Sequence, residues 1–279
     1  MKPIAKVYTA ILFLFLFAPI VIMLVFSFNS GNSLSVLSGF STYWYKELFH
    51  DANTLGALRN TLILALCAAI LSTIMGTAAA VGMNKLRSKY MKAAMNTVTN
   101  LPMVNPEIIT GISLMMLFVA YQRFTEGVDF LPDTIMGLPT LLIAHIAFNV
   151  PYVIFNVTPK LKQMDKALPE AAMDLGCTPF RAFLKVELPE ILPGVLTGMI
   201  MAFTLSLDDF VISYFTAGST TQTLSMVIYS MAKKRVSPEI NALSTLMFLV
   251  VVALMVLVNL RQARQERMEK RRRAVLSAK

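Results

Sequence analysis

Long apolar stretches separated by short polar segments dominate the sequence. Six apolar stretches reach the roughly 20 residues that a helix needs to cross a bilayer. We therefore predict membrane-spanning helices near residues 8–28, 59–83, 94–121, 138–158, 191–213 and 239–260. The composition agrees, because only 15% of the residues are charged, against about a quarter in soluble domains. The fold class predicted is an all-α membrane protein with six transmembrane helices.

The first apolar stretch follows Lys2 and Lys6, an arrangement also found in secretory signals. Its apolar run is longer than a typical signal core and no small-x-small cleavage motif follows it, so we expect a retained span. No internal repeat is evident and no Gly/Ser-rich linker divides the chain. We predict one membrane domain over residues 1–279.

The basic residues predict the orientation, because lysine and arginine concentrate on the cytoplasmic side of membrane proteins. With the N-terminus inside, 19 of the 25 basic residues lie on the cytoplasmic side. The tail at 261–279 holds eight of them, against Glu266 and Glu269. Such a tail could bind nucleic acid in a soluble protein, but directly after a membrane helix it is better explained as a cytoplasmic segment facing lipid. Both termini are predicted to be cytoplasmic.

A polar segment at 159–190 separates the fourth and fifth predicted spans. Gly176 suits the left-handed position that ends a helix. Thr178 suits a helix N-cap, and Pro179 suits the first helical position after it. We therefore predict two short helices that meet at a corner formed by residues 176–178. Small residues before this corner would let the first helix lie deep in a groove of a partner protein.

The spacing within this segment resembles the EAA loop of ABC importer permeases. The family pattern is Glu-Ala-Ala, three residues, Gly, nine residues, Ile, one residue and Leu-Pro, and Val186 takes the place of the Ile. The matching positions are Glu170, Ala171, Ala172, Gly176, Leu188 and Pro189. The resemblance implies a helix-loop-helix that docks onto a cytoplasmic ATPase, and the orientation argument independently places this segment in the cytoplasm. An ordinary amphipathic linker is the alternative, and the full spacing argues against it.

Three acidic residues stand out within predicted spans: Glu107 in the third, and Asp208 and Asp209 in the fifth. An acidic residue at the centre of a span costs about 2.5–3.5 kcal/mol on insertion scales, so a functional or paired role is the default expectation. Neighbours on a helix point about 100° apart, so the two aspartates cannot both face one cavity. We expect one to face a polar pathway and the other a partner group or a helix end. The alternative is that these acids are protonated, bonded to backbone, or paired with Arg59 or Arg123.

Two prolines, Pro102 and Pro106, precede Glu107. Each removes an amide donor and clashes with the carbonyl four residues earlier. Carbonyls freed in this way must face protein or a water-filled cavity when they lie in a membrane. Broken helices near the middle of the membrane are typical of transport sites. We predict a helix break here, with a kinked but well-packed helix as the alternative.

The outer connection at 29–58 carries an aromatic cluster, Tyr43-Trp44-Tyr45, on a possible short helix. Such residues commonly anchor a protein at the membrane interface. The alternative is that Trp44 or Tyr43 faces a substrate entrance, and the sequence leaves both open.

Other chemistry is not indicated. Cys67 lies in an apolar run and Cys177 in the polar segment, so no disulfide framework or metal cluster is expected. His50 and His145 are isolated and are interpreted as structural. The sequence contains no Gly-x-x-x-x-Gly-Lys phosphate loop, so we do not expect the chain to bind ATP itself. No cofactor and no enzyme activity are predicted, since no nucleophile–base pair stands out.

Four further strings resemble the spermidine/putrescine permeases of PotC type, namely residues 40–45, 106–114, 203–210 and 236–243. This resemblance implies the MetI-like fold of type I ABC importers in a bacterial cytoplasmic membrane. It also implies a second, non-identical permease, an ATPase dimer and an external polyamine-binding protein. In that family an outer-loop tryptophan and acidic positions in the third and fifth spans are associated with polyamine transport. The corresponding residues are Trp44, Glu107 and Asp208, with Asp209 beside it; close relatives often carry Asp where Glu107 stands.

The chemistry of the residues agrees with a polyamine. A polycation is recognised by spaced carboxylates and aromatic faces, whereas a metal cation calls for a dense cage of oxygen ligands. Two alternatives stay open: an ABC permease for another small organic cation, and a proton-coupled secondary transporter in which Glu107 or Asp208 carries the proton. The second would leave the EAA-like segment without a purpose.

Overall fold

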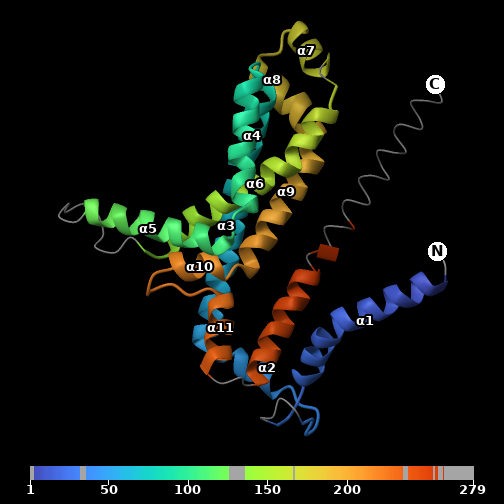
Figure 1. The fold of residues 1–279 in the computed structure, drawn as a ribbon, viewed down its shortest axis with the longest axis vertical. Helices are drawn as coiled ribbons and strands as arrows, with labels where there is room; N and C mark the ends of the chain where they lie inside the picture. Colours follow the sequence, from blue (N-terminus) through green and yellow to red (C-terminus); the bar gives the residue numbers. More distant parts are fainter. Residues whose placement is uncertain are drawn as a thin grey trace. The chain divides into compact units, whose positions relative to one another are not determined.

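The computed structural model describes residues 3–31, 36–125, 136–165, 167–234, 238–253, 255–256 and 260 (Figure 1). Its regular structure in these ranges is helical, apart from an isolated β-bridge between Asn29 and Phe40. The elements are α1 (Pro3–Phe26), α2 (Tyr43–Leu48), α3 (Ala52–Lys85), α4 (Lys89–Val104), α5 (Glu107–Thr125), α6 (Leu138–Gln163), α7 (Ala167–Asp174), α8 (Pro179–Ala182), the π-helical turn η1 (Phe183–Glu187), α9 (Leu188–Asp208), α10 (Val211–Thr216), α11 (Leu224–Lys234) and a last helix, Pro238–Ala253.

The chain divides into two compact units. Unit 1 comprises residues 1–58 and 224–279, and unit 2 comprises residues 59–223. The boundary falls inside α3, so this helix contributes its first turns to unit 1 and the remainder to unit 2. The single permease domain expected from the sequence stays a prediction.

In the part of the chain that the structure describes, five helices are long and apolar enough to cross a membrane. They are Ala5–Phe26, Ala52–Lys85, Glu107–Thr125, Leu138–Gln163 and Pro179–Asp208. The sixth predicted span, 239–260, corresponds to the shorter apolar helix Pro238–Ala253, and most of its remaining residues lie outside the described ranges. The six-span count and the cytoplasmic location of both termini therefore stay predictions.

The third predicted span, 94–121, is not one helix. α4 ends at Val104 and α5 begins at Glu107, and Figure 1 shows the two running in clearly different directions. Asn105 is extended, with ψ at 136°, as expected of a residue that precedes proline. The break thus lies at Asn105–Pro106. Our expectation was wrong for Pro102, which lies inside α4; no residue of α4 is buried, so the carbonyl that Pro102 leaves without a donor is not sealed in a core.

The fifth predicted span, 191–213, is also not one helix. The helical rod begins earlier, at Pro179, runs through α8, η1 and α9, and ends at Asp208. Asp209 has ψ at 125°, which takes the chain out of helical geometry before α10 starts. The predicted spans that contain Glu107, Asp208 and Asp209 are therefore both interrupted beside those acids.

Unit 2 is built around α6, whose buried residues include Val153, Val157 and Leu161. Two glycines allow close approach to it. A Cβ atom on Gly76 of α3 would lie 2.7 Å from Val153 Cβ, and one on Gly194 of α9 would lie 2.9 Å from the Asn156 carbonyl oxygen. Such contacts leave no room for a side chain, so α3 and α9 are packed tightly against α6.

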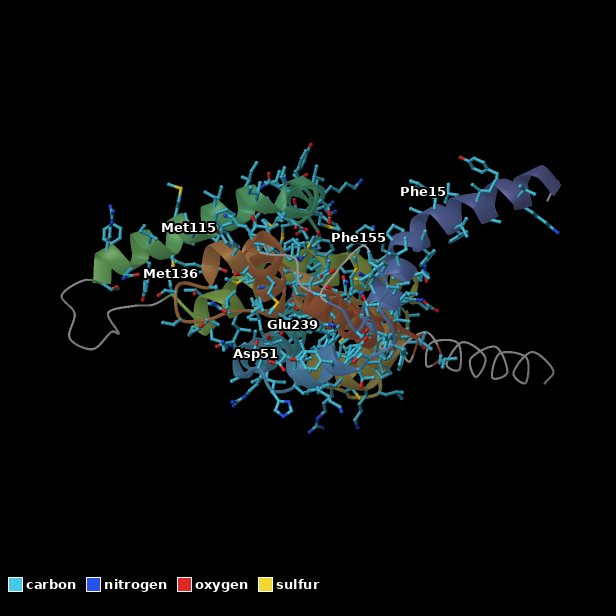
Figure 2. The ribbon with its side chains drawn as sticks, turned by 90° about the horizontal axis from the view of Figure 1, so that it is seen from below. Phe15, Asp51, Met115, Met136, Phe155 and Glu239 are labelled. Carbon is cyan, nitrogen blue, oxygen red and sulfur yellow. The ribbon has the colours of Figure 1, made fainter. Side chains whose placement is uncertain are left out.

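Unit 1 has a smaller core, in which Leu48, Leu224 and Leu243 are buried. Asp51 begins α3: its carboxylate accepts backbone hydrogen bonds from Asn53 and Thr54, at 3.0 and 3.2 Å. α1 is different, because none of its most apolar window is buried, and Figure 2 shows Phe15 among the side chains that project from it. An apolar helix exposed all round suits a surface that meets lipid or another chain.

Candidate functional site

The predicted corner in the EAA-like segment begins with a Schellman ending of α7. Gly176 adopts φ +85°, and its N–H donates to the carbonyl of Met173 at 2.9 Å. The N–H of Cys177 donates to the carbonyl of Ala172 at 3.1 Å. These two bonds and the left-handed residue define this helix ending. The left-handed glycine expected from the sequence is confirmed.

The second half of the corner starts α8. Thr178 is extended, its hydroxyl accepts from the N–H of Arg181 at 3.4 Å, and Pro179 occupies the first helical position. The predicted N-cap and the meeting of two short helices at residues 176–178 are therefore confirmed.

The corner presents an exposed apolar surface. Leu175 is 87% exposed and Phe180 is 69% exposed, and Leu168, Met173 and Leu184 add to the exposed apolar area around them. Exposed apolar side chains that gather on one corner suit a site that meets another protein or a membrane. The motif was predicted from the sequence but these side chains were not; their apolar character between polar neighbours was the available signal.

The EAA-like positions divide between this surface and the start of α9. Glu170, Ala171 and Gly176 are exposed and Ala172 is half-buried. Leu188 and Pro189 are the first two residues of α9, and Leu188 packs against the core of unit 2. The motif therefore spans the distance from the exposed corner to the first turn of a long helix.

The three predicted acidic residues are brought together in unit 2. Glu107 lies in the first turn of α5, Asp208 ends α9, and Asp209 lies between α9 and α10. α5 crosses α10 at Gly111, where a Cβ atom would be 3.0 Å from the ring of Phe215, and Figure 1 shows the two helices alongside each other.

The two aspartates have different surroundings. Asp208 is exposed, as is Glu107, whereas Asp209 is buried at 9% exposure. The carboxylate of Asp209 accepts from the N–H groups of Ile212 and Ser213, at 3.3 and 2.8 Å. Asp209 therefore caps α10, and Asp208 is the aspartate that remains accessible.

A cluster of buried polar side chains between α6, α9 and α10 supports this cap. His145 Nε2 lies 3.5 Å from an Asp209 carboxylate oxygen and 3.1 Å from Ser213 Oγ. One turn later on α6, Asn149 Nδ2 donates to Ser206 Oγ at 2.7 Å. His145 was expected to be an isolated structural residue, and the other members of this polar cluster were not predicted. The available signal was the four-residue spacing of His145 and Asn149 in an apolar helix, which places both on one face.

The basic partners that the sequence left open for Glu107 are Arg59 and Arg123. Arg123 stands sixteen residues later on α5, about 24 Å along the helix. Among the described residues, no lysine or arginine forms an ion pair with Glu107. The three acids are also not grouped as metal ligands within that part of the chain.

Trp44 belongs to unit 1, where the predicted short helix is confirmed as α2. Its indole N–H donates to the carbonyl of Asn29 at 2.9 Å, and its ring meets that of Tyr43 edge-on at 5.1 Å between centroids. Trp44 is partly buried, while Tyr43 is 54% exposed. Its role at a substrate entrance stays a prediction.

Residues 72–273 match the family described as the binding-protein-dependent transport system inner membrane component. The chain belongs to this family. Its relatives include the putrescine transport system permease protein PotI of Escherichia coli (strain K12), 40% identical over 237 residues that cover 84% of this chain and 82% of the relative. The spermidine/putrescine permease PotC of the same strain is 35% identical over 245 residues, covering 88% of each chain.

Solved structures of this family's fold also match. A bacterial ABC transporter involved in import of the acidic polysaccharide alginate has a TM-score of 0.76 at 18% identity, over 93% of this chain and 94% of that chain. The MetNI methionine ABC transporter has a TM-score of 0.53 at 17% identity, over 77% and 98%. The MetI-like permease fold and the resemblance to polyamine permeases are thus confirmed. The chain is an ABC importer permease and a multi-pass membrane protein, not an enzyme.

Proposed function

We propose that this permease imports polyamines, and that Glu107 and Asp208 attract the protonated amines. The observation that carries the proposal is the convergence of two exposed carboxylates from separate helices, while the third acid, Asp209, is occupied as a helix cap. Two carboxylates on different elements suit a ligand with separated positive charges, each of which can form a charge-assisted hydrogen bond. The relatives named for putrescine and spermidine transport support the same substrate class.

Trp44 supplies a second, separate element of this proposal. Because its N–H is already bonded to the Asn29 carbonyl, its contribution to a cation would come from the face of the ring. Replacing Trp44 with leucine should weaken uptake by the equivalent of about 0.5–2 kcal/mol if the ring meets the cation. An interfacial anchor would instead lower the amount of protein in the membrane and leave uptake per molecule unchanged.

The proposed partners are a cytoplasmic ATPase dimer, a second non-identical permease and an extracytoplasmic polyamine-binding protein, in a bacterial cytoplasmic membrane. The ATPase would dock on the corner around Gly176, whose exposed apolar residues suit a protein interface. This arrangement requires residues 159–190 and the basic tail at 261–279 to be cytoplasmic. The tail lies outside the described residues, and its placement rests on the distribution of basic residues.

The test uses the chain purified with its co-expressed partners and reconstituted in liposomes. Putrescine and spermidine should each be taken up on ATP addition, and Glu107→Gln and Asp208→Asn should each reduce uptake by about tenfold or more, because each removes a charged hydrogen-bond partner worth roughly 1.5–3 kcal/mol. Basal ATPase activity should persist. Glu47→Gln is the matched control, because Glu47 is an exposed acid on α2 in unit 1.

All comparisons need equal amounts of assembled complex, since degradation of the permease would lower uptake in the same way as loss of the binding site. Normal uptake in both Glu107→Gln and Asp208→Asn would mean that these acids are structural. A different organic cation that displaces polyamines and is itself transported would redirect the substrate assignment within the same class of permease.

A further inference from the structure

An ion pair joins two parts of unit 2 that lie far apart in the sequence. Lys85, the last residue of α3, places its Nζ 2.9 Å from a carboxylate oxygen of Glu187, the last residue of η1. The side chain of Glu187 is 5% exposed, against 55% for Lys85. Within the described part of the chain, the second carboxylate oxygen of Glu187 is buried without a hydrogen-bond partner. Glu187 thus depends on Lys85 for compensation of its charge.

A pair of this kind is a poor means of stabilising a fold. Burying a carboxylate carries a desolvation cost that a single partner barely offsets, and apolar residues of similar size commonly serve stability as well or better. A positioning role accounts better for a buried glutamate at this position.

The position of Glu187 on the helical rod is also unusual. The N–H of Leu188 donates to the carbonyl of Phe183, five residues back instead of four, which makes η1 a π-helical turn. Such turns are rare and occur frequently at functional sites. η1 lies between α8, which starts at the exposed corner, and α9, which ends at Asp208. One continuous rod therefore links the docking surface to the acidic cluster.

Beyond η1 the rod is held differently on its two sides. Against α6 it is packed tightly, since a Cβ atom on Gly194 would lie 2.9 Å from the Asn156 carbonyl oxygen and one on Gly198 would lie 3.2 Å from Val153 Cα. Toward α3 it borders an open apolar groove of about 640 Å³, lined by residues of α3 and by Phe183, Leu184, Leu188 and Val195. The groove leaves fewer contacts to keep α3 and the rod in register. Lys85 lies three residues after Gly82, the last groove-lining residue of α3, and Glu187 lies between the groove-lining residues Leu184 and Leu188. The Lys85–Glu187 pair therefore bridges α3 and the rod beside the groove.

We propose that the Lys85–Glu187 ion pair is a coupling strut, in which Glu187 acts as a positioning residue for transport. It ties the π-helical turn to the end of α3, so that a displacement of the corner around Gly176 moves α3 together with α9. This inference rests on the proposed role of residues 159–190 as the ATPase-docking segment. It assigns a transport role to Lys85 and Glu187, neither of which belongs to the motif positions.

The test measures putrescine imported per ATP hydrolysed by the whole reconstituted complex. Glu187→Gln and Lys85→Met should each lower this ratio about tenfold, in the range expected for coupled neighbours, while ATP hydrolysis continues. The exchanged pair Lys85→Glu/Glu187→Lys and the conservative Lys85→Arg should restore most of it. Lys89→Met, an exposed lysine at the start of α4, and Glu47→Gln are the matched controls and should leave the ratio unchanged.

If the pair were merely structural, its loss would reduce the amount of assembled complex. Uptake and ATP hydrolysis would then fall in proportion, and the putrescine imported per ATP hydrolysed would stay unchanged. That result overturns the strut, as does an exchanged pair that couples no better than the single variants. Where Glu187→Gln does not accumulate in the membrane, the exchanged pair and Lys85→Arg decide the question in the same way.

The proposed function fails through different observations. An unmodified complex that moves neither putrescine nor spermidine contradicts the substrate, and the strut is then measured as ATPase stimulation by the complex's own binding protein. A Gly176→Pro complex that retains the ATPase and full uptake contradicts the docking segment.

Discussion

Substitutions of Gly176 should rank according to how well each residue tolerates its backbone conformation. With φ at +85° and nothing within 4 Å of a built Cβ atom, the cost of alanine is conformational and not steric. A left-handed conformation costs an ordinary residue about 1–2 kcal/mol, and asparagine less. Alanine should therefore reduce the population of the correctly formed corner by about 5- to 30-fold, since each 1.4 kcal/mol is tenfold.

Proline should be the most damaging substitution at this position. Its φ is restricted to about −65°, which excludes the conformation of Gly176. It also removes the N–H that donates to the Met173 carbonyl, worth about 0.5–1.5 kcal/mol. We expect Gly176→Asn to transport best, Gly176→Ala to be impaired, and Gly176→Pro to lose both transport and the bound ATPase while still reaching the membrane.

The assay combines copurification of the ATPase with ATP-driven putrescine uptake at matched membrane levels. Gly56→Ala is the control: Gly56 lies within α3, and a Cβ atom there also meets nothing within 4 Å, but its backbone is helical. It should be neutral or slightly stabilising. Full transport by Gly176→Pro, or equal loss in Gly56→Ala and Gly176→Ala, would refute this reasoning.

Three further predictions concern the helix caps and the topology. Asp209→Ala should lower the thermal stability of the purified permease by about 1–3 kcal/mol, because two buried amides lose their acceptor, and Asp209→Asn should lose less; equal losses would contradict the cap. The hydrogen bond from the Thr54 hydroxyl, then those from backbone amides, hold the pKa of Asp51 below its ordinary value. The contribution of Asp51 to the free energy of unfolding is therefore present above that ordinary pKa and is lost as the pH falls through the lowered pKa. Stability, measured by thermal denaturation, should accordingly fall less on acidification in Asp51→Asn than in the unmodified protein. In a background without Cys67 and Cys177, a cysteine near residue 268 should be protected from an impermeant thiol reagent in intact cells and one near residue 33 labelled; the reverse pattern contradicts the orientation.

Local features could be predicted from the sequence because they depend on residues a few positions apart. The left-handed conformation at Gly176 follows from the absence of a Cβ atom, and the start of α8 follows from a capping hydroxyl followed by proline. The break at Pro106 is equally local, since proline lacks an amide hydrogen and restricts Asn105 before it. The lengths of the apolar stretches indicated a membrane protein through the thickness of the bilayer.

The sequence by itself therefore determined the membrane class, the corner of the EAA-like segment and the three acids as candidates. Only the tertiary structure decided that Asp209 is buried as a cap while Asp208 stays exposed, because this depends on the chain leaving helical geometry after Asp208 and on His145 approaching from α6. The pairing of Lys85 with Glu187 was likewise decided only by the tertiary structure. Contacts between helices depend on how each helix is rotated and where it crosses its neighbours, and those variables are set by the packing of whole faces, including the glycines that let α3 and α9 approach α6.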